Sequence, residues 1–136
     1  MTNDELLMDE ERNNNDPLGS KSMDFAVRIH KLYKHLIDQS QYHIANQIFR
    51  SATSIGANLA ESRFASSDID FRNKLKIASK ECSETLFWLE LLYRTAYITK
   101  NGYQSLYKDC AEIHKMLIAS TKTLTDKINK RNDKTK

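Results

Sequence analysis

Residues 70–92 read DFRNKLKIASKECSETLFWLELL, and their apolar side chains recur at alternating spacings of four and three positions. Such spacing places one continuous stripe on a single face of an α-helix. A stripe of this length is typical of helices that cross at shallow angles in a bundle. The stripe continues a little further and consists of Phe71, Leu75, Ala78, Cys82, Thr85, Leu89, Leu92 and Ala96. This stretch therefore predicts a long core helix.

Both ends of the segment carry helix-boundary signals. Ser67 and Asp70 resemble a capping box, in which a hydroxyl oxygen caps the first turn and a carboxylate three residues later reaches back. After the stripe, residues 99–102 read Thr-Lys-Asn-Gly. Because Asn and Gly suit the C-terminal cap of a helix, these residues predict a short connection to the next helix.

Three further segments have the same helical period. Residues 23–38 and 42–63 precede the quoted stretch, residues 103–128 follow it, and each has apolar residues three and four positions apart. The 136 residues include only three Gly and one Pro, too few for the turns of a many-stranded protein. Short links make successive helices antiparallel. The sequence therefore predicts an all-α, up-down-up-down four-helix bundle.

We expect this bundle to occupy residues 22–129. Residues 1–21 are expected to be a disordered acidic leader, because Asn and acidic residues precede the turn-like sequence Asp-Pro-Leu-Gly at 16–19. Residues 130–136 are expected to be a frayed basic tail. No apolar stretch approaches the ~18 residues that span a bilayer, and the N-terminus lacks the apolar centre of a signal peptide. A cytoplasmic protein without a membrane partner is expected.

Charge divides unevenly along the chain. Residues 1–20 carry six Asp or Glu and one Arg, whereas the remaining 116 residues carry 20 Lys or Arg and 12 Asp or Glu. A basic body of this kind attracts polyanions, although many helical domains have basic faces for solubility alone. The richest basic segments supply the candidate nucleic-acid-binding residues Arg28, Lys31, Lys34, Arg72, Lys74, Lys76 and Lys80.

A polar row on the second predicted helix is the candidate oligomer interface. Its members recur at heptad spacing beside a row of small residues that lets another backbone approach closely. In an isolated monomer the row would be a solvated face, whereas between copies it would be a hydrogen-bonded stripe that fixes their register. The flanking small residues favour the second interpretation. The candidate interface residues are Ser51, Ser54, Gly56, Asn58 and Glu61.

The sequence offers little for catalysis. Glu81 and Glu84 lie one helical turn apart and can share a hard cation, which leaves a Mg²⁺-dependent nucleotide hydrolase as one alternative. Such an enzyme needs further converging acids, and no second pair of the same spacing accompanies this one. The four His make no Glu-x-x-His pair of the kind that holds di-iron in bundles. We therefore expect no catalytic residue, metal or cofactor.

The two cysteines both fall on apolar stripes. If the connection after the third helix is centred near Lys100, then Cys82 and Cys110 differ in depth along the bundle by about 12 Å. That separation is too large for a disulfide. We expect both to be buried small hydrophobic residues rather than nucleophiles.

The second and third predicted helices resemble a known family. FRSATSIGANLAESR (residues 49–63), followed by the stretch quoted first, is similar to the bacterial four-helix-bundle protein family, whose founding members are encoded within intervening sequences of large-subunit ribosomal RNA genes. DFAVRIHKLYKHL (24–36) resembles that family's entry helix, and GYQSLY (102–107) its fourth. The resemblance covers roughly residues 22–128. The family usually has Gly after the Ala-Glu of the second helix, where this chain has Ser62.

The resemblance implies a homopentamer of bundles set side by side around a central axis. The chain is also similar, more distantly and in fold, to the pentameric accessory protein of diversity-generating retroelements, which uses a basic surface to engage reverse transcriptase and nucleic acid. Together with the basic body, this implies a non-catalytic scaffold whose partners are itself and RNA, DNA or a reverse-transcriptase-like enzyme. A pure protein-assembly module that ignores nucleic acid is the other alternative.

Overall fold

The computed structural model describes residues 16–134, and these residues form four helices. No strand occurs in this range, so the predicted all-α fold is confirmed for it. The predicted leader falls mainly on residues 1–15, which lie outside the described part of the chain. In chain order the helices are α2 (Pro17–Asp38), α3 (Tyr42–Ser62), α4 (Asp68–Arg94) and α5 (Lys100–Lys134).

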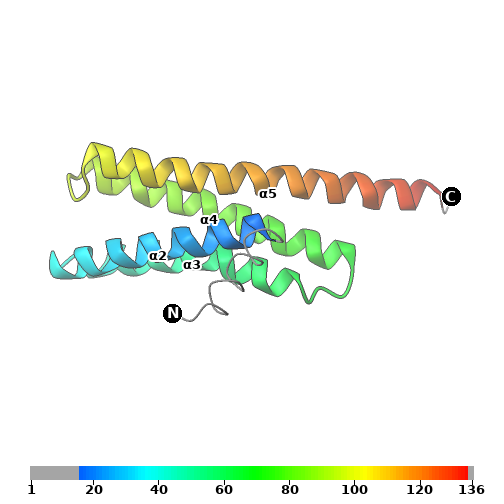
Figure 1. The fold of residues 1–136 in the computed structure, drawn as a ribbon, viewed down its shortest axis with the longest axis horizontal. Coiled ribbons are helices and arrows are strands. Elements are labelled where there is room, and N and C mark those ends of the chain that lie inside the picture. Colours follow the sequence, from blue (N-terminus) through cyan, green and yellow to red (C-terminus); the bar gives the residue numbers. More distant parts are fainter. Residues whose placement is uncertain (1–15, 135–136) are drawn as a thin grey trace, which may run out of the picture.

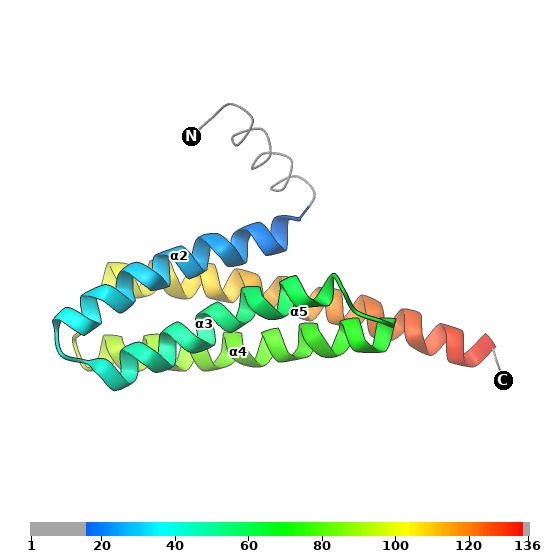
Figure 2. The same cartoon turned by 90° about the horizontal axis from the view of Figure 1, so that it is seen from below.

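The helices pack beside their neighbours in the sequence. Figure 1 shows α2 alongside α3 and α4 alongside α5, and Figure 2, turned by 90°, shows α3 alongside α4. Contacts join α2 to α3, α3 to α4 and α4 to α5, and the ring closes more sparsely between α2 and α5. Within residues 16–134 the diagonal pairs of helices make no such contact. Short links between packed helices give the predicted antiparallel order.

One apolar core runs along the inside of the bundle, and the predicted stripe of α4 lies within it. Leu75, Cys82 and Leu92 are at most 2% exposed. Burying one large apolar side chain contributes about 1.5–3 kcal/mol to the stability of the fold. The fold is therefore stabilised by the packing of these apolar stripes against one another. Among the described residues, no helix combines the length and apolarity needed to cross a membrane. The large, fully buried residues that α2, α3 and α5 contribute to the same core are Phe25, Ile29, Leu36, Ile48, Ile55, Ile113 and Leu117.

The first helix begins at Pro17, earlier than the predicted Met23. The Asp16 carboxylate caps it by accepting a hydrogen bond from the Gly19 N–H at 2.9 Å. Pro17 occupies the start of the helix, where its fixed φ suits the helix and its missing N–H leaves no bond unmade. The turn-like sequence at 16–19 is therefore a helix start, and the expected leader boundary at residue 21 is wrong.

The start of α4 confirms the predicted capping box. Ser67 Oγ accepts a hydrogen bond from the Asp70 N–H at 3.1 Å. The Asp70 carboxylate reaches back and accepts one from the Ser66 N–H, also at 3.1 Å. The two side chains therefore satisfy two of the N–H groups that a helix start leaves without an intrahelical partner.

The connection between α4 and α5 lies earlier in the chain than predicted. α4 ends at Arg94, and Ala96 has a positive φ of 65° where the chain reverses. Residues 101 and 102 belong to the first turn of α5. There the Thr99 Oγ1 accepts a hydrogen bond from the Gly102 N–H at 3.1 Å. The prediction of a C-terminal cap at Asn-Gly was wrong because the Thr99 hydroxyl caps a new helix at this point.

The last helix continues to Lys134, past the predicted end at residue 129. Lys127 and Arg131 project from its final turns toward Asp68 at the start of α4. The Lys127 Nζ lies 3.6 Å from Asp68 Oδ2, and Arg131 is paired with the same oxygen. These ion pairs extend the helix beyond the core, and Figure 1 shows its red end projecting past the rest of the bundle.

Candidate nucleic-acid interface

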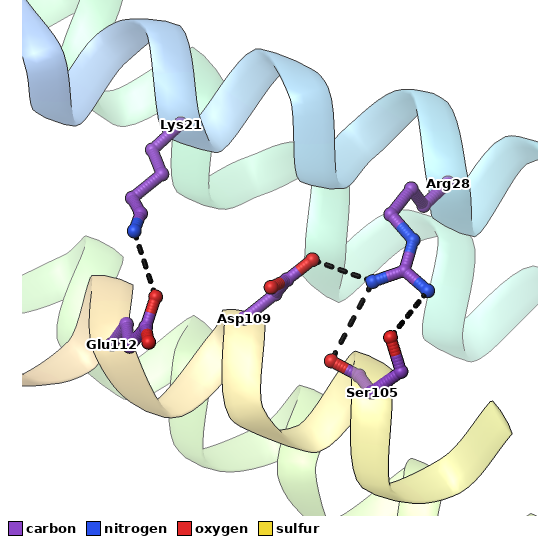
Figure 3. A network of polar contacts seen from close by, with 5 residues as sticks. All are labelled: Lys21, Arg28, Ser105, Asp109 and Glu112. Carbon is purple, nitrogen blue, oxygen red and sulfur yellow. Dashed lines mark hydrogen bonds and ion pairs between the residues drawn. The ribbon is translucent and has the colours of Figure 1, made fainter. Parts of the chain in front are cut away.

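Arg28, the first of the seven candidate basic residues, forms an ion pair with α5, as does Lys21, which lies two turns earlier on α2. Arg28 Nη1 lies 2.5 Å from Asp109 Oδ2, and Nη2 donates a hydrogen bond to Ser105 Oγ at 2.9 Å. Lys21 Nζ donates one to Glu112 Oε2 at 2.7 Å (Figure 3), which raises the pKa of Lys21 and lowers that of Glu112. Because these contacts join α2 to α5 where packing is sparse, Arg28 serves the fold.

Two candidates on α4 also face other protein groups. Lys74 Nζ donates a hydrogen bond to Glu61 Oε2 of α3 at 2.8 Å, and this bond raises the pKa of Lys74. Arg72 is half-buried, and its Nε is enclosed without a hydrogen-bond partner among the described residues. Both side chains are therefore poorer phosphate ligands than a solvated lysine.

Lys31 and Lys34 lie on the outer side of α2. Both are exposed, and neither forms an ion pair with any residue in the range 16–134. They share α2 with Arg28 but are distant in the fold from the candidates on α4, because α2 and α4 are diagonal and do not contact one another. The seven residues therefore do not form one surface.

The last two candidates, Lys76 and Lys80, line a groove between α4 and α5. Lys122 of α5 lines the same groove, which has a volume of about 400 Å³. All three lysines are exposed, and none is ion-paired within the described residues. We call this site the lysine groove; its residues are Lys76, Ser79, Lys80, Ile118, Thr121 and Lys122.

Apolar atoms form nearly all of the surface of the lysine groove, so the lysines line it with their aliphatic stems. The ammonium groups of these three exposed lysines are the part of the site that suits a phosphate backbone. Ammonium and hydroxyl groups are the side-chain donors that proteins commonly direct at phosphate oxygens. Three lysines around one groove can contact several phosphates at once, and each such contact would release condensed counterions. Ile118, which is 54% exposed, gives the groove an apolar surface against which a sugar or base can rest.

Lys122 was not among the predicted residues because these come from dense basic segments, and no basic residue directly adjoins Lys122. The signal that identifies it is a spacing of seven, shared by Lys108, Lys115 and Lys122. Residues seven apart lie on the same face of a helix. The face was therefore readable from the sequence, although the meeting of that face with Lys76 and Lys80 was not.

The polar row proposed as an oligomer interface turns toward α4 instead. Ser51 is fully buried, donates a hydrogen bond to the Ile48 carbonyl at 3.2 Å and lies 2.9 Å from Thr85 Oγ1 of α4. It is enclosed within one chain, so its assignment to an interface between copies was wrong. Asn58 donates to the Ser54 carbonyl of its own helix at 2.8 Å.

The remaining interface candidates are divided between two sides of α3. Glu61 is paired with Lys74 on the side toward α4. Gly56 faces α2, where a Cβ atom added to it would lie 3.8 Å from the Ser22 Cβ. No single stripe therefore joins the small residues to the polar row.

A second groove, between α2 and α3, contains the small residues. It has a volume of about 400 Å³ and is lined mostly by apolar side chains. Met23 on its wall is 55% exposed, and the fully buried Ser22 hydroxyl has no hydrogen-bond partner among residues 16–134. We call it the small-residue groove; its residues are Gly19, Ser22, Met23, Ala26, Thr53, Gly56, Ala57, Leu59, Ala60 and Arg63.

Of the two acids considered for Mg²⁺, Glu84 is held by protein groups. Glu84 accepts a hydrogen bond from Trp88 Nε1 at 3.2 Å and lies 3.8 Å from Arg50 Nη2. Partial burial and the neighbouring Glu84 charge raise the pKa of Glu81. Among the described residues, no three His, Cys, Asp or Glu side chains are grouped closely enough to hold a metal ion.

The two cysteines are neighbours across the interface of α4 and α5. Both are 0% exposed, and Cys110 Sγ lies 3.6 Å from the Cys82 carbonyl oxygen. The predicted difference in depth was wrong because the connection lies between Arg94 and Lys100 rather than around Lys100. The contact with Cys82, together with burial, raises the pKa of the Cys110 thiol, which keeps it protonated.

Comparison with known proteins agrees with the helical arrangement. The sequence model of the 23S rRNA-intervening sequence protein family matches residues 18–119, which include three of the helices and much of α5. The chain belongs to this family. The resemblance found in the sequence is thereby confirmed. The family match includes Lys76 and Lys80 but ends three residues before Lys122.

A solved family relative has the same fold. It is a protein of unknown function from the S23 ribosomal protein family of Bacteroides thetaiotaomicron, 52% identical in sequence, with a TM-score of 0.76. The alignment covers 77% of this chain and 98% of the relative. No curated protein matches the chain. The comparisons thus give the family and the helical fold.

Proposed function

We propose that this chain is a non-catalytic binding module that attaches to nucleic acid through the lysine groove. The observation that carries the proposal is the convergence of Lys76, Lys80 and Lys122 on one groove without carboxylate partners in the described residues. Flexible ammonium groups bind phosphate without demanding a fixed partner shape, which favours nucleic acid over a reverse-transcriptase-like enzyme as the direct partner. The buried thiols Cys82 and Cys110 suit the reducing cytoplasm, where we place the protein.

We assign no catalysis to the acidic pair. Arg50 neutralises part of the Glu84 charge, and Trp88 occupies one of its oxygens. A cation would have to displace both contacts and find further ligands, since Mg²⁺ demands octahedral coordination.

The test compares two double variants that each remove two lysines. K76Q/K80Q alters the lysine groove, and K31Q/K34Q removes the same charge from α2. Binding of labelled RNA and DNA is measured at two salt concentrations. We expect K76Q/K80Q to weaken binding and to reduce the slope of log K against log salt by about 2. Equal effects of the two variants, or no binding at low salt, would refute the proposal.

A second part of the proposal is assembly with itself, in the homopentamer that the family resemblance implies. The supporting observation is the small-residue groove, which is apolar in an otherwise basic body. Its only charged residue, Arg63, is paired with Asp16. Two copies can approach there without bringing like charges together.

Light scattering tests the assembly. The expected mass is five times the 15.8 kDa chain mass. Ala57 and Ala119 are both exposed helical alanines, but only Ala57 lines the small-residue groove. Ala57→Glu should lower the mass, and Ala119→Glu should leave it unchanged. A monomeric mass for the unaltered chain would remove assembly from the proposal without affecting the nucleic-acid site.

A further inference from the structure

The outer side of α5 carries a straight row of lysines. Lys108, Lys115 and Lys122 repeat every seven residues, and all three are exposed. At 1.5 Å per residue the row is about 21 Å long. Ala111, Glu112 and Ile118 lie between the lysines, and Glu112, the acid in this row, is paired with Lys21 of α2. The lysine groove is one end of a longer basic surface.

A matching row lies on the outer side of α4. Lys76, Lys80, Ser83 and Phe87 alternate four and three apart, which puts them on one face of the helix. Phe87 is 58% exposed, and its ring meets Trp88 edge-on with centroids 5.1 Å apart. An aromatic ring is thus held at the surface beyond the lysines of α4. Figure 1 shows α4 and α5 side by side along this length.

Two acidic residues of α5, Asp109 and Glu112, are held by α2, whereas the exposed Asp126 lies one turn beyond Lys122, at the end of the row. Asp109 and Glu112 are paired with Arg28 and Lys21 of α2 (Figure 3). On α4, Glu90 lies beyond Phe87 and holds Arg94 at 3.3 Å. The outer surface of the seam between the two helices, from Lys76 to Phe87, therefore carries mainly positive charge.

The straightness of the seam distinguishes between nucleic-acid forms. A strand of a duplex winds around the helix axis, so a straight row of lysines meets only a few of its phosphates before the strand turns away. A flexible single strand can lie along a straight groove, place successive phosphates on the lysines and turn bases toward an aromatic side chain.

Resting on the proposed function, we infer that the α4–α5 seam binds single-stranded nucleic acid. The backbone follows Lys108, Lys115 and Lys122, and Phe87 provides a surface on which a base stacks. Because lysine and phenylalanine contacts of this kind use no base edge, the recognition is independent of sequence. RNA and DNA strands share this chemistry.

Fluorescence anisotropy with three labelled probes tests the inference on the full chain. The probes are a mixed-sequence 15-nucleotide RNA, the DNA strand of the same sequence, and that DNA as a duplex. We expect at least one single strand to bind about tenfold more tightly than the duplex. K108Q/K115Q/K122Q should reduce its salt slope by about 2, because each phosphate contact of a single strand contributes about 0.7 to the slope. The matched control K31Q/K34Q/K100Q removes three exposed lysines elsewhere and should retain the wild-type slope.

Phe87→Ala tests the stacking surface separately. Loss of one base–aromatic stack, worth about 1–3 kcal/mol, should weaken single-strand binding by roughly 5- to 100-fold and leave duplex binding unchanged. Urea unfolding shows that each variant is folded. Equal affinity for strand and duplex would overturn the inference while the proposed function stood. Dependence on Lys76 and Lys80 without dependence on the α5 row would also overturn it, and absence of all binding would remove both.

Discussion

Two hydroxyl groups, from Ser51 and Thr85, meet inside the core between α3 and α4. The Thr85 Oγ1 lies 2.9 Å from Ser51 Oγ and 2.8 Å from the Glu81 carbonyl oxygen. Ser51 in turn donates to the Ile48 carbonyl. Because each buried hydroxyl has a partner, neither incurs the cost of an unsatisfied polar group. The pair links two helices at a fixed position along their length.

Replacing Thr85 by Val keeps the shape of the side chain and removes the hydroxyl. We expect the free energy of unfolding to fall by about 1 kcal/mol, because Ser51 loses its donor. Ser51→Ala should have a similar cost. The double variant should cost less than the sum of the two, since it leaves no unpaired hydroxyl. Urea unfolding measures all three, and additive costs would show that the hydroxyls do not interact.

Cys110 gives the stability a dependence on alkaline pH. Its pKa is raised in the folded protein by the contact with Cys82 and by burial. A thiol in the unfolded chain titrates near pH 8.5. The folded chain keeps this proton where the unfolded chain releases it, so stability is retained below that pH and falls as pH rises above it.

Urea unfolding at pH 7 and pH 9.5 measures this effect. The wild-type chain should lose stability between the two, and Cys110→Ala should lose less. In the native state at pH 8, Ellman's reagent should label Cys110 slowly, and denaturation should accelerate the reaction. Rapid labelling of the native protein, or an unchanged pH dependence in the variant, would show that the thiol is not protected.

The sequence predicted which residues are buried better than it predicted which buried residues meet. Cys82, Thr85 and Cys110 were placed on core stripes by their spacing alone, and all three are 0% exposed. The spacing within one helix does not determine how far a neighbouring helix is shifted along it. For that reason the contact of Cys110 with Cys82 and that of Thr85 with Ser51 were not predicted.

At the level of the helix, the ends depend on single side chains. Asp16 caps α2 through the Gly19 N–H and is paired with Arg63 at the end of α3. One carboxylate thus starts the first helix and ties it to the second. A Cβ atom at Gly19 would collide with this carboxylate, which explains the glycine there.

Asp16→Ala removes both contacts of this carboxylate. We expect it to lower the free energy of unfolding by about 1 kcal/mol, the usual cost of losing a helix cap. Asp16→Asn keeps a capping oxygen and loses only an exposed ion pair, so its cost should be a few tenths of a kcal/mol. Urea unfolding compares the two. Equal costs would show that the ion pair, rather than the cap, stabilises α2.

The helices themselves were predictable because many residues of each helix share the apolar periodicity. A helix boundary, in contrast, is indicated by only one or two residues. Asp16 and Pro17 read equally as a turn or as a helix start, and only packing of the following residues on α3 decides between them. The same ambiguity affected Asn101 and Gly102. In contrast, Ser67 with Asp70 combined two signals at a fixed spacing, and that boundary was predicted correctly.

At the scale of the molecule, ion pairs between helices engage one set of basic residues and leave another set without acidic partners among the described residues. The acids Glu61, Asp109 and Glu112 hold Lys74, Arg28 and Lys21 between helices. Such exposed pairs contribute at most about 1 kcal/mol each. Their larger consequence is to leave the unpaired lysines on the outer side of α4 and α5. Counts of charge along the chain cannot show this division, because it depends on which helices are neighbours.

The charge of residues 1–15 opposes that of the basic surface. This segment carries five Asp or Glu and one Arg. Any nucleic acid attracted to the lysines is repelled by the attached acids, and screening weakens both effects. A chain that begins at Asp16 keeps the α2 cap and should bind a single-stranded probe about 3- to 10-fold more tightly at low salt than the full chain does.

A full-length variant with the five acids changed to Asn or Gln separates charge from length. If the effect is electrostatic, this variant and the truncated chain should bind alike, and their advantage over the unaltered chain should shrink as salt rises through the range where the Debye length falls below about 10 Å. Tighter binding by the truncated chain alone would mean that the segment blocks the surface physically. If both variants bound the probe with the affinity of the unaltered chain, the acids of residues 1–15 would not oppose binding. The exposed lysines of α4 and α5 would then act independently of that segment.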